Sequence, residues 1–237
     1  MVAAPPLRIS DRLPACAPMP PFAAVIFDND GLLLDTEDAW TRAEVTLFAR
    51  RDRVWTTEHK RDLIGSSGPV AAAKLERMLV RPGEGAALLD ELNGLVMEEV
   101  LKGVEPRPGA VELVAKLAAA GVPLGLASNS LRPFVVRVLA GAGLLGDASP
   151  FEVVVTGSDV KHAKPAPDLY LAAAAALGAA PECCAGLEDS PPGAASALAA
   201  GLFVIGVPYF PDGEMPEGVH LRAGSLADPE VHAALGV

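Results

Sequence analysis

The chain has 237 residues, of which 51% are hydrophobic, enough for one large domain or a core with a modest inserted domain. The formal net charge of -11 and the lack of a Lys/Arg run argue against nucleic-acid binding. The longest uncharged stretch, 190–211, is broken by prolines and glycines, which argues against a membrane span.

The first 21 residues hold six prolines and no continuous apolar core of the kind that a signal peptide needs, so 1–21 is predicted to be a flexible extension. The three cysteines are an odd number, and neighbours such as Cys183 and Cys184 seldom pair because the bridge would be strained. We therefore expect a cytoplasmic protein with buried thiols, present as a monomer or weak homodimer.

Strand-like and helical segments alternate along most of the chain. Apolar runs predict strands at 23–27, 123–127, 151–156, 183–187 and 202–207. Ala- and Leu-rich segments between the later strands predict helices at 131–140, 167–177 and 191–200. This alternation predicts an α/β fold, a doubly wound parallel sheet with helices on both faces.

The gap between the first two predicted strands is far longer than one crossover helix requires. Charge-rich helices are predicted in it at 38–50, 57–63, 69–80 and 84–101, and a further helix at 110–120. We expect a helical cap domain at 38–105 inserted into a core formed by 22–37 and 106–237. An insertion there overhangs the edge of the sheet and can act as a lid.

Residues 27–37, Phe-Asp-Asn-Asp-Gly-Leu-Leu-Leu-Asp-Thr-Glu, place several carboxylates directly after the first predicted strand. Asp28 and Asp30, two residues apart at a strand end, can bind a divalent cation. One carboxylate can then act as a nucleophile while the other transfers a proton. Taken alone, the run is also compatible with a solvated acidic loop or a calcium site.

Three further polar clusters are predicted to lie beyond strand ends: Ser128-Asn129-Ser130, Lys164, and Glu188-Asp189-Ser190. Each also has an ordinary structural interpretation. The serine can cap a helix, the lysine can be a surface residue, and the acidic pair can cap the helix that follows. Because the carboxyl ends of parallel strands meet at one edge, we expect the four clusters to form a single site.

Together the clusters resemble the four signature motifs of the haloacid dehalogenase superfamily of phosphotransferases, over about residues 25–208. The matching motifs are Asp28-x-Asp30-Gly31-x-Leu33-x-Asp35-Thr36-Glu37, Ser128-Asn129, Lys164-Pro165-x-Pro167 and Glu188-Asp189-Ser190. The resemblance implies a Rossmann-like α/β core, and the insertion stands where this family has its helical cap.

The resemblance also implies roles for the acidic residues. Asp28 is the expected nucleophile, which forms an aspartyl-phosphate, and Asp30 is the expected general acid and base. Mg²⁺ is expected on the Asp28 carboxylate, the Asp30 backbone carbonyl and Asp189, with Glu188 nearby. Dehalogenases of the superfamily generally lack the second aspartate, so Asp30 favours an oxygen leaving group.

The remaining motifs are expected to bind the phosphoryl group, through Ser128, Asn129 and Lys164. Related mutases usually carry a cap histidine where this chain has Trp40 and an arginine near Gly68, and neither is present. Hydrolysis is therefore favoured, with a β-phosphoglucomutase-like phosphomutase and a non-enzymatic metabolite-binding protein kept as alternatives.

The segment after Glu37, Trp40-x-Arg42-Ala43-Glu44, is similar to bacterial hexitol and 2-deoxyglucose-6-phosphate phosphatases. The expected substrate is thus a small phosphorylated metabolite, a sugar or polyol phosphate. Trp40 and Glu37 are candidate specificity residues, although Trp40 is equally compatible with packing in the cap. Arg42, Glu44 and Lys74 are expected to be solvated on cap helices.

Overall fold

The computed structural model describes residues 21–146 and 149–237. The predicted extension 1–21 lies outside the described residues apart from its last position. None of the described helices is long and apolar enough to cross a membrane. The cytoplasmic location and the oligomeric state stay predictions.

A six-stranded sheet forms the centre of the fold, with the strand order β3-β2-β1-β4-β5-β6 and parallel pairing throughout. The strands are β1 (Ala24–Phe27), β2 (Leu124–Ser128), β3 (Val153–Thr156), β4 (Cys184–Glu188), β5 (Phe203–Gly206) and β6 (Leu221–Arg222). The chain extends from β1 to one edge through β2 and β3, then returns to β4 beside β1. A topological switch point therefore lies between β1 and β4.

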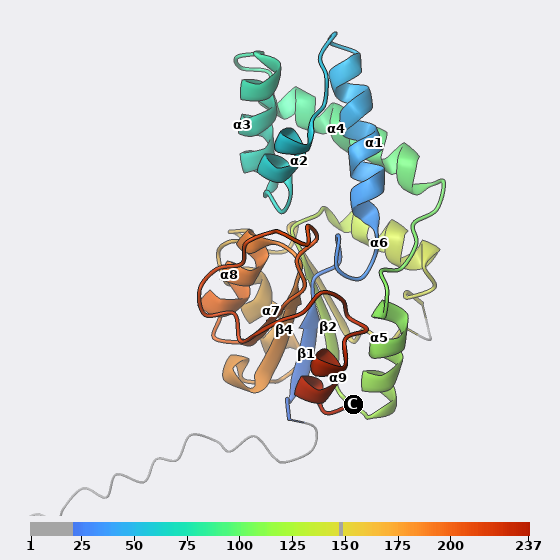
Figure 1. Ribbon diagram of the computed structural model, residues 1–237, viewed down its shortest axis with the longest axis vertical. Helices are drawn as coiled ribbons and strands as arrows, with labels where there is room; N and C mark the ends of the chain where they lie inside the picture. Colours follow the sequence, from blue (N-terminus) through green and yellow to red (C-terminus); the bar gives the residue numbers. More distant parts are fainter. Residues whose placement is uncertain (1–20, 147–148) are drawn as a thin grey trace, which may run out of the picture.

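Helices cover both faces of the sheet (Figure 1), which confirms the predicted α/β class. On one face are α5 (Ala110–Ala119), α6 (Arg132–Gly141) and α9 (Pro229–Leu235), and on the other α7 (Asp168–Ala176) and α8 (Pro191–Ala199). Successive residues of a strand point to opposite faces. Accordingly, Val25 and Phe27 belong to the core on the face of α5, α6 and α9, whereas Ala24 and Ile26 belong to the core on the face of α7 and α8.

The remaining helices are gathered at one end of the molecule, beyond the carboxyl edge of the sheet (Figure 1). They are α1 (Thr36–Ala49), α2 (Thr57–Leu63), α3 (Gly68–Leu79) and α4 (Gly85–Val100), and α4 packs against both α1 and α3. The expected boundaries of the core and of the cap at 38–105 stay a prediction.

The two connections between these helices and the sheet run side by side. The Asp35 backbone N–H donates to Glu105 O at 2.8 Å, and the Arg107 N–H donates to Leu33 O at 2.9 Å. A further bridge joins Leu34 to Pro106. The chain therefore leaves and re-enters the sheet at one place, directly after the acidic run.

Three elements lie outside the sequence predictions: the two-residue strand β6, the single-turn 3₁₀ helix at Pro181–Cys183 and the terminal helix α9. All are short, and short elements carry little periodicity. Cys184 is a buried free thiol, as expected, and Cys16 lies outside the described residues.

Candidate active site

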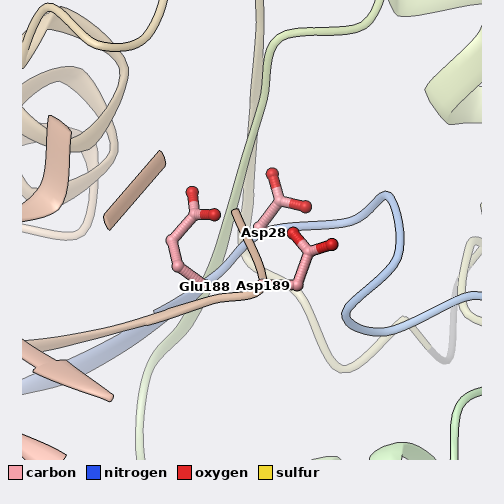
Figure 2. A group of neighbouring side chains, drawn as sticks. All are labelled: Asp28, Glu188 and Asp189. Carbon is pink, nitrogen blue, oxygen red and sulfur yellow. The ribbon is translucent and has the colours of Figure 1, made fainter. Parts of the chain in front are cut away.

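Three carboxylates converge at the switch point. Phe27 pairs with Leu187 in the register of β1 and β4, so Asp28 emerges beside Glu188 and Asp189. Each of the three acids offers a carboxylate oxygen within 4.8 Å of the others, and all three side chains are buried. Figure 2 shows them on adjoining chain segments at the strand ends. Burying like charges so close together requires nearby positive charge.

Lys164, in the loop before α7, supplies one such charge. Its Nζ donates to Asp28 Oδ1 at 2.5 Å, to Glu188 Oε1 at 2.6 Å and to Ala127 O at 2.7 Å. These acceptors use all three hydrogens of the ammonium group. Tyr170 also donates to Glu188 Oε1, at 2.7 Å. The lysine is thus held rigidly beside Asp28, with only 3% of its side chain exposed.

The electrostatics of the site follow from burial and crowding. Burial raises the pKa of Asp28 well above its usual value; Lys164 opposes the shift, and Glu188 adds to it. Burial likewise raises the pKa of Asp189, and the charge of Asp28 raises it further. Burial lowers the pKa of Lys164, but Asp28 and Glu188 overcome this and raise it above its usual value. The lysine therefore stays charged among carboxylates that lack sufficient positive partners.

Asp30 has a different environment, built from hydroxyl groups. Its Oδ2 accepts hydrogen bonds from Ser128 Oγ at 2.9 Å and Ser130 Oγ at 2.8 Å. Its Oδ1 accepts from Thr36 Oγ1 at 2.9 Å and Asn29 Nδ2 at 3.2 Å. Because a hydroxyl can both donate and accept, these partners suit Asp30 in either protonation state.

Asn129 ties the loops of the site together. Its Oδ1 accepts from the Lys164 backbone N–H at 2.8 Å, and its Nδ2 donates to Gly65 O, beyond α2, at 3.3 Å. Of the residues predicted for catalysis, phosphate binding and metal binding, those that line one common cavity are Asp28, Asp30, Asn129, Lys164 and Asp189. Ser128 and Glu188 support Asp30 and Lys164 instead, so the predicted contact of Ser128 with a phosphoryl group stays a prediction.

The acidic cluster has the donor chemistry of a site for a hard cation. Asp189 Oδ2 is buried and has no hydrogen-bond partner among the described residues. The Glu188 oxygens, in contrast, are engaged by Lys164, by Tyr170 and, at 3.3 Å, by Ser190 Oγ. Carboxylate oxygens are the ligands that Mg²⁺ prefers. Asp28 and Asp189 therefore fit a divalent cation better than Glu188 does.

The cavity above these residues has a volume of about 580 Å³ and extends between helices α1–α4 and the sheet. Its far wall is largely apolar, with Leu92, Val96 and Phe134 among its residues. The two candidate specificity residues, Glu37 and Trp40, both line it. Trp40 also packs on Phe134, with ring centroids 5.6 Å apart, so its ring contributes to packing and to the cavity wall.

A second buried lysine lies in the wall of this cavity. Lys60 Nζ, on α2, pairs with Glu37 Oε2 and donates to Glu44 Oε2 and to Glu37 O, both at 3.3 Å. All three side chains line the cavity. Burial raises the pKa of Glu44 to about 7, and Lys60 opposes that shift. The expectation that Glu44 is solvated is wrong, because only 2% of the residue is exposed.

Sequence reasoning placed Ser130 in a polar cluster but gave it no role, and it missed the contacts of Thr36, Tyr170 and Lys60. Ser130 and Thr36 stand within or beside quoted motifs, so their hydroxyls were available as a signal. Lys60 and Tyr170 stand in ordinary helical sequence, and nothing in their local pattern distinguishes them from surface residues.

Fold and site together define an α/β protein in which a buried aspartate at the end of the central strand β1 is paired with a lysine. Residues 22–201 match the haloacid dehalogenase-like hydrolases, and this match spans most of the chain. The protein therefore belongs to the haloacid dehalogenase-like hydrolase family, which confirms the resemblance drawn from its motifs.

Individual relatives agree with this assignment. Protein CbbY of Rhodobacter capsulatus is 33% identical over 218 residues, which are 89% of this chain and 94% of the relative. Hexitol phosphatase A of Escherichia coli K12 is 36% identical over 187 residues, 77% and 81% of the two chains. The crystal structure of CbbY from Rhodobacter sphaeroides in complex with phosphate has a TM-score of 0.78 at 29% identity, covering 91% of this chain and 100% of that one. The chain is accordingly a phosphoric monoester hydrolase.

Proposed function

We propose that the protein is a Mg²⁺-dependent phosphatase that hydrolyses a small sugar or polyol phosphate through an aspartyl-phosphate on Asp28. The observation that carries the proposal is the contact of Lys164 with both Asp28 and Glu188, directly beside Asp30. It joins a nucleophile, a fixed positive charge and a separate acid at one end of the cavity.

In the first step a carboxylate oxygen of Asp28 attacks phosphorus, and the bond from phosphorus to the ester oxygen breaks. Asp30 donates its proton to that oxygen, so the alcohol leaves uncharged. The hydroxyls of Ser128, Ser130 and Thr36 orient Asp30 for this transfer. Lys164 offsets the negative charge of Asp28 and of the phosphoryl group as the two approach.

In the second step water attacks the phosphorus of the aspartyl-phosphate. Asp30, now ionised, accepts a proton from the water, and the bond between phosphorus and the Asp28 oxygen breaks. Phosphate is released, and both aspartates return to their starting states. One carboxyl group thus serves as acid and then as base, which requires the hydroxyl environment that surrounds Asp30.

Asp28, Asp189 and the backbone carbonyl of Asp30 are the proposed ligands of Mg²⁺, and Glu188 orients Lys164. When bound, the cation reduces the repulsion between the carboxylates and the phosphate and stabilises charge on the phosphoryl oxygens. The partnerless Asp189 Oδ2 supports this assignment. Ser128, Asn129 and Lys164 are the proposed contacts of the phosphoryl group, and Ser128 and Lys164 make theirs by exchanging one of their present hydrogen bonds for a phosphoryl oxygen.

The substrate class rests on two supports. A relative that is 36% identical is named for its action on hexitol phosphates. Trp40 and Glu37, which line the same cavity as the acidic cluster, offer an aromatic face and a carboxylate of the kind that suits a polyhydroxylated alcohol. Helices α1–α4 cover the site and exclude water from it.

Phosphate release from a panel of sugar and polyol phosphates, with Mg²⁺ and with a chelator, tests the proposal. We expect chelation to abolish turnover, and Asp28→Asn to reduce kcat by at least about a thousandfold, because the nucleophile is lost. The exposed Asp90→Asn is the matched control and should retain activity. Phosphate release that survives both metal removal and Asp28→Asn would exclude the proposed chemistry, and formation of an isomeric sugar phosphate would indicate a mutase.

A further inference from the structure

Helix α1 presents one polar and aromatic face to the cavity, built from Glu37, Trp40 and Glu44. Their spacing of three and four residues places them on the same side of a helix. Glu37 lies toward the acidic cluster, since the charges of Asp30 and Asp35 act on it. Glu44 lies two turns further along α1, and the charges that act on it are those of Lys60 and Glu37.

The donors of Lys60 beside this face are all engaged in hydrogen bonds, whereas one acceptor of Glu44 is not. Lys60 has three donors, and Glu37 Oε2, Glu37 O and Glu44 Oε2 engage all of them. Glu44 Oε2 has this one partner, whereas Glu44 Oε1 accepts no hydrogen bond from the described part of the chain. Lys60 therefore has nothing left to donate to a ligand, while Glu44 retains an open acceptor in the cavity wall.

A purely structural ion pair does not explain this arrangement. One ammonium group compensates one carboxylate, and here it faces two, so the cluster retains about one negative charge when both acids are ionised. Burying an unsatisfied charged oxygen is costly unless a donor reaches it. Leu92, Val96 and Phe134 in the cavity lining have no donors on their side chains, and the polar lining residues, such as Asn93, donate no hydrogen bond to Glu44 within the described part of the chain. A hydroxyl group on a molecule that fills the cavity would supply the missing donor.

We propose that Glu44 is a specificity-determining residue that accepts a hydrogen bond from a hydroxyl group of the leaving alcohol, and that its charge discriminates against substrates with a second phosphate. The inference rests on the proposed phosphatase activity and adds to it the feature that the enzyme recognises in the alcohol. Lys60 holds Glu44 in place, and Trp40, one turn away, offers an apolar face to the carbon skeleton.

The test compares kcat/KM at pH 8 with saturating Mg²⁺ for four kinds of substrate. They are hexose and hexitol monophosphates, their deoxy analogues, the corresponding bisphosphates, and p-nitrophenyl phosphate, whose leaving group carries no alcohol hydroxyl. The variants are Glu44→Leu, which removes the acceptor, and Glu44→Gln, which keeps the shape and removes the charge. Glu98→Gln, on the exposed side of α4, is the matched control.

We expect removal of one particular hydroxyl to reduce wild-type kcat/KM by roughly tenfold to a hundredfold, the range for a hydrogen bond to a charged group. Glu44→Leu should lose the same factor on the hydroxylated substrate and should no longer distinguish the deoxy analogue. Glu98→Gln should retain wild-type turnover of every substrate, and both Glu44 variants should lose less on p-nitrophenyl phosphate than on the hydroxylated substrate. Glu44→Gln should use bisphosphates several times better, relative to monophosphates, than the wild type does.

Glu44→Leu that keeps the full deoxy discrimination overturns the inference, as does a parallel loss of turnover on every substrate in Glu44→Gln. If Glu44→Leu does not fold, the bisphosphate ratio of Glu44→Gln decides, and an unchanged ratio counts against the proposal. A wild-type protein that releases phosphate from none of these substrates would instead refute the phosphatase function. The two failures are therefore distinguishable.

Discussion

Two buried lysines in this molecule each face two carboxylates. Lys164 lies between Asp28 and Glu188, and Lys60 lies between Glu37 and Glu44. In each case the ionised cluster carries one more negative charge than the lysine neutralises. Removing charges from water costs several kcal/mol per ion, so neither cluster is explained by stability alone. The proposed ligands, a cation at the first cluster and a hydroxyl donor at the second, would account for both.

The Glu44 carboxyl group should make the stability of the protein depend on pH. Burial raises its pKa from 4.5 to about 7, so between these values the folded protein binds more protons than the unfolded chain. The free energy of unfolding must then fall as pH rises from about 4.5 to 7. In Glu44→Gln this contribution is absent. We expect the variant to gain about 1 to 3 kcal/mol relative to wild type between pH 5 and pH 8.

Urea unfolding of both proteins in metal-free buffer, repeated at several pH values, measures this difference. The direction in which the relative stability of Glu44→Gln changes with pH decides whether Glu44 is a strained, buried acid. A relative stability of Glu44→Gln that stays constant or falls with rising pH would show that Glu44 is not a strained, buried acid. If the stability of Glu44→Gln relative to wild type rises with pH, and the variant also loses substrate discrimination, Glu44 is retained for recognition at a cost in stability.

At the scale of elements, the start of α8 is built into the site. Ser190 Oγ accepts from the Gly193 N–H at 3.2 Å and so caps the helix, and it donates to Glu188 Oε2 at 3.3 Å. A Cβ at Gly193 would overlap the Glu188 carboxyl group. The first turn of α8 therefore fixes Glu188, which in turn fixes Lys164. The acidic pair does not cap this helix, as one sequence interpretation allowed; the serine after it does.

Two glycine-to-alanine changes in helices should consequently have opposite effects. Gly193→Ala must displace Glu188, and we expect a loss of at least about 1 to 3 kcal/mol in stability together with a large fall in kcat. Gly94→Ala, in α4, has open space around the added methyl group and should stabilise the protein by about 0.5 to 1 kcal/mol. Thermal unfolding and kcat of the two variants provide the measurement. Equal effects would contradict the coupling of α8 to the site.

At the scale of the whole molecule, the sequence predicts the parts that depend on local pattern. Apolar runs locate the strands from β1 to β5, and glycine and proline breaks locate α1–α4. Parallel pairing then brings Asp28, Asn129, Lys164 and Asp189 to one edge, although they are far apart in the chain. The short elements β6 and α9 lack such a pattern and were not predicted.

The burial of Glu44 was beyond a reading of the sequence for a different reason. It depends on how α1 and α2 pack against each other and on the position of Lys60, sixteen residues away. A glutamate in a charged helix is normally solvated, and only the tertiary contact reverses that expectation. The proposed recognition of the substrate alcohol therefore depends on packing between helices, whereas the proposed phosphate chemistry depends on motifs that follow strands.

Metal binding should be visible in the stability of the whole protein. At a Mg²⁺ concentration a hundred times its Kd, binding to the folded state alone adds about 2.7 kcal/mol, which raises the Tm of a chain of this size by roughly 5 to 10 °C. Asp189→Asn removes both a proposed ligand and a buried acid whose pKa burial and Asp28 raise. Without metal this variant should be at least as stable as wild type, and Mg²⁺ should barely change its Tm.

Differential scanning calorimetry with Mg²⁺ and with a chelator separates these effects without any assay of turnover. The exposed Asp90→Asn should retain the full Mg²⁺-dependent increase in Tm, because it changes the net charge equally without touching the acidic cluster. An Asp189→Asn protein that is stabilised by Mg²⁺ as strongly as wild type would contradict the proposed ligands. If the Mg²⁺-dependent increase in Tm is lost in Asp189→Asn and kept in Asp90→Asn, cation binding explains why the three carboxylates are crowded together at the switch point.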